Sequence, residues 1–317
     1  RRMISNFDRS KLSARGFIVL VNDVDITLPD GTLVPSGVAF RNNFHLNPLV
    51  TGDFFVPCGG RPAAVNADNV DAFLFGASKD GAATAGAGDE AAAAAAASGS
   101  RKPRFKYIVE GANLFFTNEA RLAIEKKGVI LFKDSSANKG GVTSSSLEVL
   151  AALSLTDSEF RANMCVAGEE SHEAHAHAPA FYKEYVAEVQ ARIDANARKE
   201  FECLWREHTT SGTAISILSD QLSVKITSLS TRIEKSDSLW NNVPLRRHVL
   251  ETALPRTLCA LVGGADAVLA RLPENYQRAL YGSALASNFI YASGLTTTEF
   301  AFFEYVDTLL HAAPKAA

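Results

Sequence analysis

Lys106-Tyr-Ile-Val-Glu-Gly-Ala-Asn113 is followed, after a helix-length gap, by Phe132-Lys-Asp-Ser-Ser-Ala-Asn-Lys-Gly-Gly-Val-Thr-Ser-Ser-Ser146. Each stretch begins with an apolar strand that runs into a turn rich in Gly, Asn and Ser. Open α/β sheets expose backbone groups to ligands at such turns, beyond the ends of their strands. The two stretches therefore predict an α/β fold with a ligand site at these strand ends.

The residues between the two turns predict a well-bounded helix. Thr117–Lys127 begins with a good N-cap, Thr117, and is followed by Gly128, a good C′ residue. We expect a strand at Val129–Phe132 and a second helix from about Ser144 to Ala152. Together these elements form a β-α-β-α segment.

Upstream of the first stretch, short apolar runs predict further strands. Gly16–Val21 and Val24–Leu28 are expected to form a β-hairpin insert, and Pro29-Asp30-Gly31 closes the second run. Asp53–Pro57 predicts another strand, and Asn66–Phe75 predicts a helix after it.

Beyond Ser154 the hydrophobic pattern changes to a period of about 3.6 residues, which is typical of amphipathic helices. The clearest such segments are Phe181–Ile193, Leu222–Ile233 and Phe300–Leu310. The C-terminal half is therefore expected to be mainly helical.

Two other segments are read as loops. Residues 76–104 are a low-complexity insert, rich in Ala, Gly and Ser, that is expected to be exposed; the alternative for its Ala91–Ala97 run is a transient helix. The GxGxxA pattern at residues 86–91 is read as chance, because no strand precedes it. His172, His175 and His177 lack the HExxH spacing of a metal site and are expected to lie in a solvated loop.

Composition narrows the class of protein. The 317 residues carry a formal net charge of −3 and are 47% hydrophobic, which is typical of a globular protein and argues against nucleic-acid binding. No apolar run approaches the roughly 18 residues that span a membrane. The four cysteines lie far apart, which favours separate buried thiols in a reducing compartment over disulfides or a metal site.

Three further motifs share one resemblance with the two opening stretches: Asp53-Phe-Phe-Val-Pro-Cys-Gly-Gly-Arg-Pro62, Glu200-Phe-Glu-Cys-Leu-Trp-Arg-Glu207 and Leu272-Pro-Glu-Asn-Tyr-Gln-Arg-Ala279. In this order they resemble the glutamate dehydrogenase family, and most closely its large NAD-dependent branch. The resemblance covers nearly the whole chain. It implies a partial Rossmann-like, doubly wound dinucleotide-binding domain over residues 1–153 and a mainly helical C-terminal region over residues 154–317.

The resemblance also implies an activity, which is the NAD-dependent oxidative deamination of L-glutamate to 2-oxoglutarate and ammonium. The upstream catalytic Lys and Asp of the family, and its glycine fingerprint, are not recognisable here, so we expect the C-terminal portion of a longer enzyme with no catalytic residue of its own. The alternatives are a non-catalytic regulatory or assembly fragment and a dehydrogenase for another amino acid. Self-association into a homo-oligomer is expected, and the location, mitochondrial or cytoplasmic, is left open.

By resemblance, the candidate site residues fall into two groups. Those at the cofactor are Cys58, Gly111, Ala112, Asn113 and Asn138; those at the substrate side chain are Val142 and Ser145. A polar Ser145 favours a substrate that bears a carboxylate.

Residue chemistry alone leaves simpler alternatives open. Asn113 is also suited to closing a turn, and Ser145 to serving as the N-cap of a capping box with Glu148. Arg61 is suited either to contacting a phosphate or to capping a helix. We expect no catalytic role for Lys139, which stands where most family members have Ala.

Overall fold

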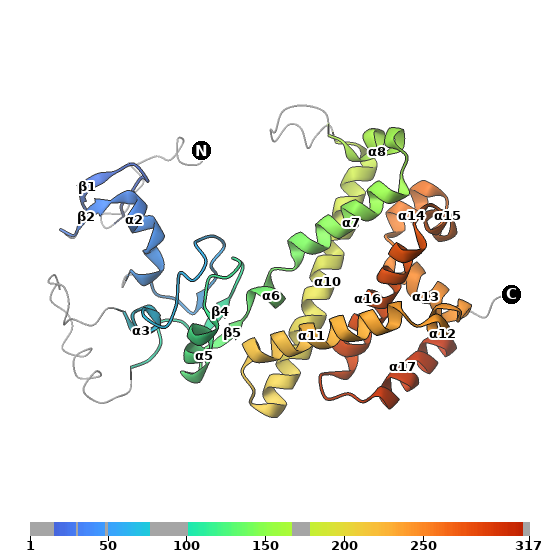
Figure 1. The fold of residues 1–317 in the computed structure, drawn as a ribbon. Coiled ribbons are helices and arrows are strands. Elements are labelled where there is room, and N and C mark those ends of the chain that lie inside the picture. Colours follow the sequence, from blue (N-terminus) through green and yellow to red (C-terminus); the bar gives the residue numbers. More distant parts are fainter. Residues whose placement is uncertain (1–15, 30, 48–49, 77–100, 167–177, 313–317) are drawn as a thin grey trace. The chain divides into compact units, whose positions relative to one another are not determined.

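The computed structural model describes residues 16–29, 31–47, 50–76, 101–166 and 178–312 (Figure 1). It divides into two compact units, residues 1–131 and residues 132–317. The domain boundary expected at residue 153 stays a prediction. Most of the 76–104 insert and the His172–His177 segment lie outside the described residues.

The first unit opens with an antiparallel hairpin of β1 (Val24–Thr27) and β2 (Leu33–Ser36), in which Ile26 faces Val34. The prediction that residues 16–21 form a strand of this hairpin was wrong. The chain turns at residues 20–23 instead, where the amide of Asp23 donates to the carbonyl of Leu20 and the amide of Leu20 donates to the Asp23 carboxylate. Ser36 then caps the short helix α2 (Gly37–Asn42), and the 3-10 turn η2 (Phe44–Leu46) follows.

A three-stranded sheet forms the centre of the same unit. Its strands, in spatial order, are β3 (Phe54–Phe55), β4 (Tyr107–Val109) and β5 (Ile130–Phe132), and β3 and β4 are parallel. Helix α5 (Asn118–Lys126) connects β4 to β5 and begins and ends as predicted. The Thr117 hydroxyl accepts from the amide of Ala120, and Gly128 has a φ of 80°.

Helix α3 (Val70–Phe75) is shorter than expected. The amide of Asn66 donates to the side chain of Asn69, so residues 66–69 form a turn instead of a first helical turn. Behind the sheet, aromatic rings make the core: the rings of Phe73 and Phe105 stack with their centroids 5.4 Å apart, and both are almost fully buried. This core packs against the strands that precede the Cys58 loop and the Gly111–Asn113 loop.

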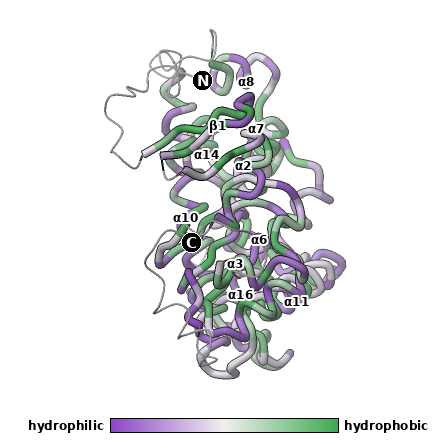
Figure 2. The backbone as a smooth tube through the Cα atoms, turned by 90° about the vertical axis from the view of Figure 1, so that its left-hand side faces the viewer, coloured by the Kyte–Doolittle hydropathy of each residue, from purple (hydrophilic) through white to green (hydrophobic). Residues whose placement is uncertain are grey.

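The second unit consists of helices, as the periodicity predicts. Their bounds are α6 (Asp134–Ala137), α7 (Gly140–Ser154), α8 (Asp157–Met164), α10 (Ala180–Ser211), α11 (Ile215–Glu234), α12 (Asp237–Trp240), α13 (Val243–Ala253), α14 (Arg256–Val262), α15 (Ala265–Arg271), α16 (Glu274–Ser293) and α17 (Glu299–Ala312). Hydrophilic and hydrophobic residues alternate along these segments (Figure 2). One core cluster joins α7, α10, α14 and α15 through residues such as Leu150, Tyr185 and Leu258.

Helices α11 and α16 pack closely along each other. A β-carbon at Gly282 of α16 would stand only 2.7 Å from the carbonyl oxygen of Ser230 on α11. Glycine is therefore required at this crossing. Within the described ranges, no helix combines the length and the hydrophobicity that crossing a membrane requires.

All four cysteines are free thiols. Cys203 is buried as expected, but Cys58 and Cys165 are exposed, so the prediction of buried thiols was wrong for these two. Cys58 lies in the loop after β3, where no element covers its side chain, and Cys165 directly follows the end of α8.

Candidate functional site

The loops that follow β3 and β4 meet at one edge of the sheet. Because these strands are parallel, their carboxyl ends lie side by side. The amide of Ala112 donates to the carbonyl of Pro57 over 2.6 Å, and a β-carbon at Gly111 would stand 3.0 Å from the same oxygen and 3.4 Å from the Cys58 sulfur. The structure therefore brings together four predicted cofactor residues, Cys58, Gly111, Ala112 and Asn113.

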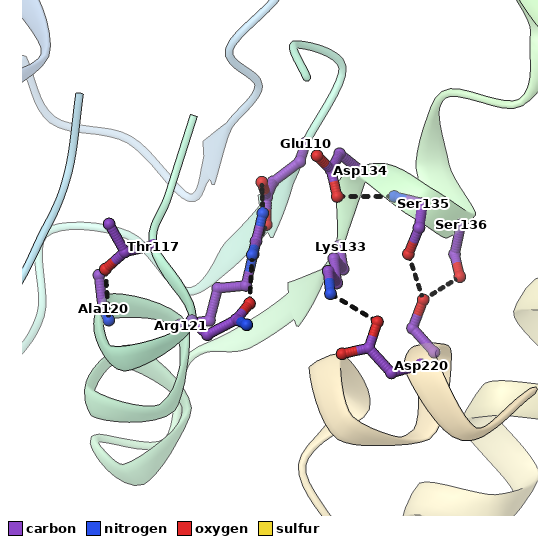
Figure 3. Close-up of polar contacts among 11 residues, drawn as sticks. Glu110, Thr117, Ala120, Arg121, Lys133, Asp134, Ser135, Ser136 and Asp220 are labelled. Carbon is purple, nitrogen blue, oxygen red and sulfur yellow. Dashed lines mark hydrogen bonds and ion pairs between the residues drawn. The ribbon is translucent and has the colours of Figure 1, made fainter. Parts of the chain in front are cut away.

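A buried ion pair holds the second of these loops in place (Figure 3). Glu110 is the residue before Gly111. Its carboxylate accepts a hydrogen bond from Nε of Arg121 on α5 at 2.7 Å and one from a second guanidinium nitrogen at 2.9 Å. Both side chains are at most 3% exposed, and Asn118 accepts a further bond from Arg121. Sequence reasoning missed this pair; its signal was a carboxylate directly before the Gly-Ala-Asn turn and an arginine on the next helix.

A cavity of about 550 Å³ borders the loop that carries Cys58. Pro57, Gly59, Gly60 and Arg61 line one part of it, and residues of the segment from Arg41 to Val50 line another. Arg61 is exposed in an irregular loop, and the N-cap of the next helix, α3, is Asn69. Arg61 therefore does not cap the N-terminus of α3, and it lines the cavity instead.

The imidazole of His45 also lines this cavity and is almost fully buried. Burial lowers the pKa of His45, a hydrogen bond with the carbonyl of Ala64 opposes that change, and the nearby charge of Arg104 lowers the pKa further. His45 is therefore neutral near pH 7, and the cationic groups that line the cavity are Arg41 and Arg61. Such a lining suits an anionic group.

In the second unit, α7 begins at Gly140 and not at Ser144. Lys139 is its N-cap, and the amide of Thr143 makes the first intrahelical bond, 2.9 Å to the carbonyl of Lys139. The amides of Gly140, Gly141 and Val142 belong to the first turn, which has no acceptors within its own helix. Asn138 lies directly before the cap, so this candidate cofactor residue adjoins the helix start.

Because α7 starts earlier than expected, Ser145 lies inside the helix and not at its N-terminus. The capping-box alternative was wrong, because Ser145 lies in the second turn and its hydroxyl donates to the carbonyl of Val142 at 3.1 Å. Ser144 makes the equivalent bond to Gly141. Both serines and Val142 are exposed. The structure thus places Val142 and Ser145 one turn apart at the exposed start of α7.

Helix α6, which precedes Asn138, is held by α11 (Figure 3). The ammonium of Lys133 lies 2.5 Å from the carboxylate of Asp220, and the hydroxyls of Ser135 and Ser136 bond that of Ser219. Sequence reasoning missed these contacts, since they join residues more than 80 positions apart.

Residues 32–212 match the Glutamate/Leucine/Phenylalanine/Valine dehydrogenase family. The match covers more than half of the chain, and the chain belongs to this family of dehydrogenases.

Among curated proteins, the chain is similar to glutamate dehydrogenase 2 of Dictyostelium discoideum, with 50% identity over 309 residues. It is also similar to the NAD-specific glutamate dehydrogenases of Neurospora crassa, at 46%, and Saccharomyces cerevisiae, at 42%. These alignments cover 96–100% of the chain but only 26–27% of the relatives. The resemblance to the large NAD-dependent branch is confirmed, and the chain spans about a quarter of the length of these relatives. No solved structure matches it significantly.

Proposed function

We propose that this chain forms the nicotinamide-facing and substrate-side-chain parts of a NAD-dependent glutamate dehydrogenase. The reaction is the oxidation of L-glutamate by NAD to 2-oxoglutarate, ammonium and NADH. The observation that carries the proposal is the meeting of the Cys58 and Gly111–Asn113 loops at the carboxyl edge of a parallel sheet, in a chain whose relatives are named NAD-specific glutamate dehydrogenases.

The cofactor role rests on the small side chains at this edge of the sheet and on the contacts that hold its loops in place. Gly111 and Ala112 present little side chain, so a nucleotide can approach the backbone closely. Asn113 follows them with an amide that both donates and accepts, and Asn138 supplies a second amide directly before α7. Bound NAD would supply the hydride acceptor; the chain's own residues bind and orient it.

The cavity beside Cys58 extends this role. Arg41 and Arg61 at its lining would attract the phosphates of a dinucleotide, and its volume of about 550 Å³ accommodates part of such a ligand. This favours the phosphate-contacting role of Arg61.

The substrate role rests on the exposed start of α7. The amides of Gly140, Gly141 and Val142 and the positive end of the helix dipole favour an anion, which here is the side-chain carboxylate of glutamate. The methyl groups of Val142 would contact the aliphatic part of the side chain. The Ser145 hydroxyl would donate to the carboxylate by turning away from the carbonyl of Val142.

Another amino-acid dehydrogenase is the second candidate, because the matching family also includes leucine, phenylalanine and valine dehydrogenases. A serine near a helix start can donate a hydrogen bond to a side-chain carboxylate, whereas an apolar substrate side chain offers no acceptor for it. We also propose that the protein self-associates, as its family resemblance implies, and that it acts in mitochondria or in the cytoplasm. A non-catalytic role remains the alternative for the chain by itself, since no catalytic residue is proposed within it.

The test is an assay of NADH formation by the purified full-length protein, with glutamate, leucine and norvaline as substrates and NAD or NADP as the oxidant. We expect turnover with glutamate and NAD to exceed every other combination. The isolated 317-residue chain should show no turnover. Preference for leucine would contradict the proposed substrate, and turnover by the isolated chain would show that its catalytic groups lie within it.

A further inference from the structure

Lys139, the N-cap of α7, is joined to α10 and α16 by one buried carboxylate. Its ammonium lies 2.7 Å and 2.5 Å from the two carboxylate oxygens of Glu200 on α10. The hydroxyl of Tyr291 on α16 donates to the same carboxylate over 2.8 Å. The Glu200 side chain is 4% exposed, whereas that of Lys139 is 42% exposed. We call these three side chains the Lys139 clamp.

The buried carboxylate of Glu200 holds the clamp together, because it must be compensated by hydrogen-bond donors and by a positive charge. Removing a charge from water is costly unless hydrogen-bond partners replace the lost hydration, so the Glu200 carboxylate requires both donors. Burial, and then the charge of Glu200, raises the pKa of Tyr291, which keeps its hydroxyl protonated and able to donate. Lys139 supplies the compensating charge from the solvent side.

The location of the clamp connects it to the candidate site. Lys139 stands between Asn138 and Gly140, so its side chain anchors the backbone from which the first three amides of α7 project. A β-carbon at Gly140 would make an ordinary contact, 3.5 Å, with Ile193 of α10. The start of α7 therefore lies close to Ile193 of α10, and the Lys139–Glu200 ion pair joins it to the same helix.

We propose that the Lys139 clamp positions the first turn of α7 for the anionic end of the substrate. Lys139, Glu200 and Tyr291 are positioning residues, because they act through the backbone of Gly140–Val142. The inference rests on the proposed substrate role of this turn. It assigns a part of the active site to α10 and α16, which belong to the helical C-terminal region.

The first experiment measures amide hydrogen–deuterium exchange in the peptide that covers residues 138–150 of the 317-residue chain. Lys139→Met and Glu200→Gln should each speed exchange in this peptide about tenfold, because the first turn loses its anchor. Lys139→Arg should keep the wild-type rate, since arginine can also pair with Glu200. Glu251→Gln, which removes one partner of the exposed Arg247–Glu251 pair on α13, is the matched control.

The second experiment measures kinetics of the same variants in the full-length protein. Lys139→Met should raise the Michaelis constant for glutamate about tenfold, with much smaller changes in that for NAD and in kcat. Lys139→Arg should restore it. If Lys139→Met or Glu200→Gln folds poorly because one charge is left unpaired, the double variant Lys139→Met/Glu200→Gln removes that charge and should recover the melting temperature. The double variant should nevertheless keep the raised Michaelis constant.

The outcomes separate the inference from the proposed function. Unchanged exchange in residues 138–150 would overturn the inference, whatever the activity. Faster exchange with an unchanged Michaelis constant for glutamate would also overturn it, because the ordered turn would then not bind substrate. A full-length protein that does not oxidise glutamate would refute the proposed function, and the exchange measurement would still decide whether the clamp orders α7.

Discussion

A β-carbon at Gly111 would stand 3.0 Å from the carbonyl oxygen of Pro57, so the two loops at the sheet edge are in close contact only because residue 111 is glycine. We predict that Gly111→Ala lowers the free energy of unfolding by about 1–3 kcal/mol, since one loop must move. Urea denaturation of the 317-residue chain measures this loss. Gly59→Ala, in the facing loop, is the matched control, because a β-carbon there would have no neighbour within 4 Å. Equal effects of the two substitutions would contradict the close contact.

The Glu110–Arg121 pair should dominate the electrostatic stability of the first unit. Arg121→Met leaves the buried Glu110 carboxylate without its partner, and we expect a loss of about 3–5 kcal/mol in denaturant unfolding. The double variant Arg121→Met/Glu110→Leu removes the unpaired charge and should recover part of the loss. Lys106→Met breaks the exposed pair with Asp53 in the same unit and should change stability little. A comparable loss from Lys106→Met would contradict the role of burial.

Acid sensitivity should arise in part at the start of α8. A hydrogen bond from the Thr156 amide, and next one from Arg271, lowers the pKa of Glu159 from 4.5 to about 2. Because the folded pKa is the lower one, this stabilisation is complete above the unfolded value and is lost as the pH falls from 4.5 towards about 2.

Glu159→Gln should therefore lower the melting temperature at neutral pH. The melting temperature of this variant should also decrease less than that of the wild type as the pH is lowered. Asp157→Asn, in the same first turn, is the control for loss of a charge. Melting curves over this pH range measure both variants. A Glu159→Gln protein with the wild-type pH dependence would show that the Glu159 carboxylate contributes nothing to it.

The local elements could be predicted from the sequence because their signals are local. Thr117 and Gly128 bound α5 as expected, since caps depend on a few neighbouring residues. The start of α7 could not be predicted in this way. Gly140 and Gly141 favour a turn by composition, whereas the structure holds them in a helix whose cap, Lys139, is anchored by Glu200, 61 residues away.

The hairpin and the contacts that hold the candidate site also depend on residues outside each local stretch of sequence, so the local pattern did not predict them. The apolar run at residues 16–21 reads as a strand, yet β1 pairs with Leu33–Ser36 because the chain turns at Asp23. The close contact of Gly111 with Pro57 requires two strands to be parallel neighbours, and this pairing is not encoded in either stretch by itself. The candidate residues could therefore be named from sequence motifs, but the residues that hold them in place could not.

Asn113 and Asn138 should matter more for hydride transfer than for cofactor affinity. In the full-length protein, Asn113→Ala and Asn138→Ala each remove hydrogen bonds worth about 1 kcal/mol apiece, which lowers kcat about fivefold for each bond lost. Steady-state kinetics with NAD titrations measure both effects. Wild-type turnover in both variants, with a lowered melting temperature, would show that these asparagines only shape their turns.

The substrate preference of Ser145→Ala in the full-length protein tests whether the start of α7 binds the side-chain carboxylate of glutamate. The Ser145 hydroxyl is proposed to donate to the side-chain carboxylate, a charge-assisted bond worth about 1.5–3 kcal/mol, so the Michaelis constant for glutamate should rise about tenfold to a hundredfold. Ser145 lies inside α7 and is exposed, so alanine should leave the melting temperature unchanged or raise it slightly.

Norvaline, which lacks the carboxylate, provides the comparison substrate, and Ser144→Ala in the same turn provides the comparison variant. The measurement is the ratio of the Michaelis constants for glutamate and norvaline. This ratio should rise at least about tenfold in Ser145→Ala and stay at the wild-type value in Ser144→Ala. An unchanged ratio in Ser145→Ala would contradict the claim that the start of α7 binds the substrate's carboxylate through Ser145.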